Sequence, residues 1–183
     1  KNNTTIEKVV FPETVETMGT EVFSSCTSLT YVGLNSGLKG IGDYTFYGCT
    51  SLKEYTVPVG ITSVGNYAFY SCTALTDIEI SSSVKNIGTY AFGNCTGLIT
   101  GVKLNEGLKT INNDAFNNCI NLEEITLPDS ITTLGYNIFI NCKKLTSINL
   151  PKSITSCGNY PYYGYGTFRD SGITTVVVPE GIT

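Results

Sequence analysis

A repeat with a period of about 23 runs through the whole chain and limits what the chain can fold into. The spacings between successive phenylalanines are 23, 23, 23, 24, 23 and 29, at Phe23, Phe46, Phe69, Phe92, Phe116, Phe139 and Phe168. Cysteine follows six of them at the third position downstream, at Cys26, Cys49, Cys72, Cys95, Cys119 and Cys142. Such a period is typical of solenoids, in which each unit buries its apolar side only against its neighbours.

Each unit has two halves with different apolar patterns. One half reads L-x-x-I-x-L, often followed by proline, and its alternation predicts a short strand with one buried face. The other half reads I-G-x-Y-A-F-x-N-C, with apolar residues three and four apart, and predicts a short helical or 3₁₀ turn. We therefore expect an α/β solenoid with one short parallel strand per 23-residue repeat and helical or 3₁₀ turns on the other side.

The repeat leaves no room for a domain boundary or a linker. Residues 1–183 are expected to form a single array of about seven turns that is incomplete at both ends. Neither end carries a distinct polar capping unit, which arrays of this kind normally need. We therefore expect the chain to be part of a longer protein.

The consensus F-x-N-C-T-x-L-x-x-I-x-L-P-x-S-I-T-x-I-G resembles the BspA-like leucine-rich repeat family. The resemblance implies a leucine-rich repeat solenoid in a secreted or cell-surface protein of mucosal anaerobic bacteria or protists. Some members bind extracellular-matrix or plasma proteins, or other cells. The family shares no catalytic residues, so none is carried over. The sequence departs from the consensus where Cys157 replaces an aliphatic residue, next to an insertion.

Composition argues against several classes of function. The chain has no histidine, which removes the commonest general base and the commonest metal ligand. We therefore expect no enzymatic activity, no cofactor and no metal. Its net charge is −4 and no basic stripe is present, so nucleic-acid binding is not expected. No apolar run approaches the roughly 18 residues of a membrane span, so the array is not expected to be membrane-embedded.

The six repeated cysteines occur once per unit and always at the same phase. Stacked residues have parallel Cα–Cβ vectors, whereas a disulfide needs them to converge. No C-x₂-C pair of the kind that binds zinc is present. We therefore predict that these cysteines, like the phenylalanines, form a structural ladder of buried side chains with free thiols.

The outward positions of the predicted strands carry the candidate contact residues Tyr31, Glu54, Asp77, Glu79 and Glu124, together with Lys103. The strand face is the usual binding surface of such arrays, although ordinary solvation explains a polar face equally well. A retaining glycosidase needs two carboxylates about 5 Å apart, and Glu54 and Asp77 on adjacent strands approach that spacing. An open sheet face, however, supplies no pocket that excludes water.

An insertion at residues 159–166 holds four tyrosines, Tyr160, Tyr162, Tyr163 and Tyr165. Tyrosine is favoured in recognition loops, so the insertion is a candidate partner-binding loop. Alternatively, it folds over the array beside Cys157 as a local lid.

These features predict a non-enzymatic, adhesin-like binding module that contacts proteins through its strand face, with or without the tyrosine-rich loop. The alternative is a passive spacer within a large surface protein.

Overall fold

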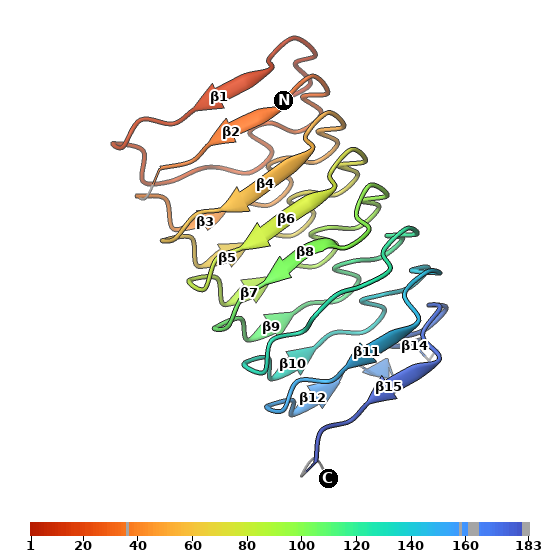
Figure 1. Cartoon of the computed structure of the whole chain (residues 1–183). Helices are drawn as coiled ribbons and strands as arrows, with labels where there is room; N and C mark the ends of the chain where they lie inside the picture. The colour runs from red at the N-terminus through yellow and green to blue at the C-terminus, as the bar shows by residue number, and fades with distance from the viewer. Residues whose placement is uncertain (36, 158, 161–164, 181–183) are drawn as a thin grey trace.

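The computed structural model describes residues 1–35, 37–157, 159–160 and 165–180. The chain winds into a stack of coils whose parallel strands form two columns along the solenoid (Figure 1). In the described residues the backbone forms strands and turns but no helix.

The first column contains the predicted strands. Its members are β1 (Lys8–Val10), β2 (Tyr31–Gly33), β4 (Glu54–Val57), β6 (Asp77–Ile80), β8 (Gly101–Leu104), β11 (Ser147–Asn149) and β15 (Thr175–Val177). Exposed and buried residues alternate most clearly in β4 and β6, whereas all three residues of β15 are exposed. The ladder is not continuous, because β1–β2, β4–β6–β8 and β11–β15 form three separate sheets.

A second column of two-residue strands was not expected, so the prediction of one strand per repeat is wrong. Its members are β3 (Gly40–Ile41), β5 (Ser63–Val64), β7 (Asn86–Ile87), β9 (Thr110–Ile111), β10 (Thr133–Leu134) and β12 (Ser156–Cys157). All six pair in one continuous parallel sheet. Such strands are too short for an alternation to be visible in the sequence.

The prediction of helical or 3₁₀ turns is also wrong, because the segments around the phenylalanines form backbone hydrogen bonds with the next coil. The N–H groups of Tyr44, Phe46 and Gly48 donate to carbonyl oxygens at the equivalent turn of the following coil. The intervening N–H groups donate backwards within their own coil, as in successive turns. Tyr44 and Gly48 have φ values of 56° and 66°, and the equivalent residues of later coils are likewise left-handed. Left-handed residues at this spacing interrupt a right-handed helix.

The core is a single stack of apolar side chains enclosed by the two strand columns and the turns. The rings of Phe46, Phe69, Phe92, Phe116 and Phe139 are fully buried. Ring centroids of consecutive phenylalanines from Phe23 to Phe168 lie 5.1–6.4 Å apart. Because identical side chains meet at every coil, the repeat of the sequence becomes a repeat of contacts.

Candidate functional site

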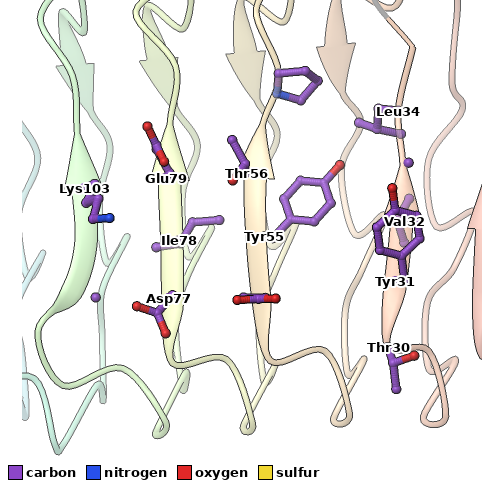
Figure 2. A pocket seen from close by; sticks show the side chains of 14 residues that line it. Thr30, Tyr31, Val32, Leu34, Tyr55, Thr56, Asp77, Ile78, Glu79 and Lys103 are labelled. Carbon is purple, nitrogen blue, oxygen red and sulfur yellow. The ribbon is translucent and has the colours of Figure 1, made fainter.

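The strand-face hollow is a shallow depression of ≈ 640 Å³ over β2, β4, β6 and β8. Its exposed lining includes four of the predicted contact residues, Tyr31, Glu54, Asp77 and Glu79, and also Lys103. These side chains point outward from neighbouring strands because they occupy alternate positions of the same register. Figure 2 shows them on successive strands across the hollow, from Lys103 through Asp77 and Glu79 to Tyr31, with Tyr55 in between.

The register of the strands places two like charges next to each other. Glu54 is paired with Asp77, whereas Glu79 is paired with Lys103 on the other side of β6. Adjacent strands are about 4.8 Å apart, so Glu54 and Asp77 occupy neighbouring positions, and the Asp77 carboxylate accepts a hydrogen bond of 2.8 Å from the Thr76 hydroxyl. None of the ion pairs found within the described ranges involves Glu54, Asp77 or Glu79. Like charges directly opposite each other on neighbouring strands destabilise a sheet.

The floor of the hollow includes a seam between β2 and β4, which do not pair. Tyr55 occupies the inward position that Val32 and Ile78 occupy on the neighbouring strands. Its ring lies 5.6 Å from Phe46 and 5.4 Å from Phe69. Figure 2 shows it pointing from its own strand towards the strand that carries Tyr31 and Val32.

Tyr55 is only 6% exposed, and its hydroxyl is buried without a hydrogen-bond partner among the described residues. Burial, with the nearby Tyr31 as a smaller cause, raises the pKa of the Tyr55 phenol well above its usual range. The group is therefore neutral at physiological pH and leaves one polar atom unsatisfied at the floor of the hollow. A buried orphan of this kind is uncommon in native proteins and calls for an explanation.

The remaining predicted contact residues are placed elsewhere. Glu124 is exposed, but it does not line the hollow. Its segment follows the coil that carries one extra residue and is not part of a strand. Tyr160 and Tyr165 pair in a short antiparallel hairpin of β13 (Asn159–Tyr160) and β14 (Tyr165–Gly166). Tyr162 and Tyr163 lie outside the described residues.

The six repeated cysteines are buried as free thiols. From Cys49 to Cys142, each thiol donates to the carbonyl oxygen of the phenylalanine in the preceding coil, at 3.1–3.2 Å. Within the described part of the chain, no group of three or more His, Cys, Asp or Glu residues is arranged to hold a metal ion.

A group of stacked tyrosines on the turn side was not predicted as a site. Tyr44, Tyr67 and Tyr90 stack with centroids 4.8 and 4.9 Å apart, and Tyr47 stacks on Tyr70 at 5.3 Å. Four of these rings, all but Tyr90, line a second hollow of ≈ 490 Å³. The regular spacing of Tyr44, Tyr67 and Tyr90 is visible in the sequence, but the 23-residue repeat by itself accounts for that spacing and gives no sign of a site.

Comparison with known proteins shows clear similarities. The family model for the BspA type leucine rich repeat region matches residues 1–100 and 96–183, with six copies. A leucine-rich repeat protein from Eubacterium ventriosum is 31% identical over 98% of this chain, with a TM-score of 0.83. A leucine-rich repeat protein of T. pallidum is 30% identical over 75% of this chain and 58% of its own, with a TM-score of 0.60.

A leucine-rich cell surface protein of Faecalibacterium prausnitzii shares the fold. It is 21% identical over 94% of this chain and 60% of its own, with a TM-score of 0.60. The present chain spans only 46% of the Eubacterium ventriosum protein. No curated protein matches the sequence. In the described part, no helix has the length and apolar character needed to cross a membrane.

Proposed function

Because the chain belongs to the family of BspA-type leucine-rich repeat proteins, we propose that it is a non-enzymatic, adhesin-like binding module of a cell-surface or secreted protein. It engages proteins of the host or of neighbouring cells, such as extracellular-matrix or plasma proteins, through the strand-face hollow. The similarity to a cell surface protein of Faecalibacterium prausnitzii supports the location.

The observation that carries this proposal is the charge arrangement of the hollow. Glu54 and Asp77 are exposed neighbours on paired strands, and neither takes part in an ion pair among the described residues. Like charges at paired positions oppose stability, and the Asp77 carboxylate is held there by a hydrogen bond from the Thr76 hydroxyl. Local arrangements that oppose stability are expected at functional sites, where a partner offsets the cost.

The alternative function is a passive spacer that holds another domain away from the surface. The continuous six-stranded sheet of the second column and the stacked phenylalanines support it, because both join successive coils and stiffen the stack. A spacer has no affinity of its own, so binding distinguishes the two functions.

Binding of immobilised protein to fibronectin, fibrinogen and whole epithelial cells tests the proposal. The hollow variant Glu54→Gln/Asp77→Asn/Glu79→Gln should lose most of the binding. The control variant Glu16→Gln/Glu124→Gln/Glu180→Gln removes the same charge from exposed carboxylates outside the hollow and should bind like the parent. Equal loss in both variants would indicate a general charge effect. Absence of binding by the parent would favour the spacer.

A further variant lacking Tyr160 to Tyr165 tests the tyrosine-rich insertion. If the insertion contacts the partner, its deletion should weaken binding and change the melting temperature by no more than about 2 °C. A drop of several degrees would instead support a lid over the end of the array. Unchanged binding by this variant would confine the contact to the strand face.

A further inference from the structure

The geometry points to an arginine-containing segment of a partner protein as the occupant of the strand-face hollow, with its guanidinium group held by Glu54 and Asp77. This inference rests on the proposed function and names the chemistry that the hollow recognises. Two neighbouring carboxylates and an orphaned hydroxyl carry it, and each is a hydrogen-bond acceptor.

The paired positions of Glu54 and Asp77 suit a guanidinium group. Glu54 and Asp77 are paired across β4 and β6, so their side chains leave adjacent strands in the same direction. Guanidinium is planar and carries five N–H donors in a rigid fork, so one group can bond to both carboxylates. An ammonium group is a compact, strongly hydrated point charge and matches such a pair less well.

The same row of outward-facing positions, continued on β1 and β2, already holds one cation. Tyr31 occupies, one repeat earlier, the position that Glu54 occupies in its own repeat, and the Lys8 ammonium lies 4.9 Å from the centroid of the Tyr31 ring. This ring is half-exposed and lines the hollow. Aromatic rings attract guanidinium groups more often than ammonium groups, so Tyr31 adds a favourable wall on the β2 side.

The buried hydroxyl of Tyr55 is a second feature of this site, independent of the carboxylates. Its hydroxyl is buried, has no partner in the described structure and lies in the seam at the floor of the hollow. No ladder hydrogen bonds join β2 to β4, so a small widening of the seam breaks none. A polar group of an extended segment lying along the seam would then satisfy the hydroxyl.

The second strand column decides how the partner enters. β3 and β5 belong to the same two coils and pair through Gly40 with Ser63 and through Ile41 with Val64. This pairing keeps the two coils at one strand spacing, so a further strand, which needs about 4.8 Å more, cannot insert between them. The partner therefore lies over the seam and reaches the carboxylates with a side chain.

The test uses an acetylated and amidated pentapeptide, Gly-Thr-Arg-Thr-Gly, added to the isotope-labelled protein while amide chemical shifts are followed. Matched peptides carry citrulline, which has the same shape without the charge, or lysine in place of arginine. The arginine peptide should produce saturable shifts at Gly33, Glu54, Asp77 and Gly101. Affinity should be about tenfold lower for citrulline, because charge-assisted hydrogen bonds are lost.

Two variants separate recognition from folding. Glu54→Gln/Asp77→Asn should reduce affinity about tenfold with an unchanged or higher melting temperature, because it removes like-charge repulsion. Tyr55→Phe should weaken binding about threefold without lowering the melting temperature, because it removes an unsatisfied buried hydroxyl. The control Glu16→Gln/Glu124→Gln should bind like the parent. Equal affinity for citrulline or lysine, or shifts away from the seam, would overturn the assignment.

The outcome is distinguishable from failure of the proposed function. Macromolecular binding that disappears in the hollow variant, without arginine-dependent shifts at the seam, would refute the arginine site and retain the binding module. Arginine-dependent shifts without binding of any macromolecule would retain the site and contradict the proposed partners.

Discussion

The thiol of Cys72 donates a hydrogen bond of 3.1 Å to the carbonyl oxygen of Phe46, which belongs to the preceding coil. The bond links two repeated positions whose side chains both lie in the core. It gives the thiol hydrogen a partner inside the apolar stack, where an unsatisfied polar group would be costly. The cysteines therefore act as small buried residues that also tie one coil to the next.

This arrangement predicts very different reactivities for the seven thiols. Burial raises the pKa of the Cys49 and Cys95 thiols to about 12 and also raises the pKa of the Cys157 thiol, but only Cys157 is exposed to a reagent. Since the thiolate is the reactive form, a thiol reagent at pH 8 should modify one cysteine quickly in the folded protein and all seven after denaturation. Mass spectrometry should place the fast site at Cys157. Rapid modification of two or more ladder cysteines would contradict a buried ladder.

Removal of one central ring should be costly. Phe69 is fully buried, and its centroid lies 5.1 Å from Phe46 and 5.3 Å from Phe92. Phe69→Ala should lower the free energy of unfolding by about 3–5 kcal/mol, measured by chemical denaturation. Phe168→Ala is the matched control and should cost less, because Phe168 is only partly buried. An equal loss in free energy of unfolding for the two variants would show that stacking in the central coils does not set the cost of losing a ring.

Four glycines that follow second-column strands lie against the backbone of the preceding coil, namely Gly42, Gly65, Gly88 and Gly135. A Cβ atom on Gly88 would lie 2.6 Å from the carbonyl carbon of Gly65 in the preceding coil. Gly88→Ala should therefore destabilise the protein by about 1–3 kcal/mol through overpacking. In the control Gly19→Ala, the new atom meets no heavy atom of the described structure within 4 Å, so stability should change little. Thermal unfolding of both variants compares the two sites.

Asp114 should make stability depend on pH in the acidic range. Burial raises the pKa of its carboxyl group, although hydrogen bonds from neighbours including Asn117 oppose the shift. The folded state therefore binds this proton more readily than the unfolded state. Its contribution to stability is fully present below the unfolded pKa of about 3.9 and is lost as pH rises through the higher folded pKa.

The variant Asp114→Asn isolates this effect. Asparagine keeps one acceptor oxygen and tolerates the left-handed backbone of this position, where φ is 57°. At pH 7 the variant should melt about 1–3 °C above the parent, because no buried charge remains. The difference should shrink as pH falls towards 3. If the difference in melting temperature does not change with pH, ionisation of the Asp114 carboxyl group is not its cause.

Much of the solenoid could be predicted from the sequence because its core is periodic. The constant phases of Phe69 and Cys72 place both in the stack, and the alternation in Asp77–Ile80 predicts strand β6. The constant length of the repeat also brings Glu54 beside Asp77. Periodicity failed for the turns, because apolar residues three and four apart also suit successive turns that pair with the next coil.

The sequence by itself therefore determined the stack, the direction in which the side chains of the first-column strands point and the neighbours at equal phase. Only the tertiary structure decided that β2 and β4 do not pair and that Glu124 lies outside the hollow. It also decided that the Tyr55 hydroxyl has no hydrogen-bond partner among the described residues. The physical reason for this difference is that the period of the sequence indicates which side chains are buried, and burial is specified within each coil. Hydrogen bonds between coils depend on whether both backbones and the side chain between them fit together.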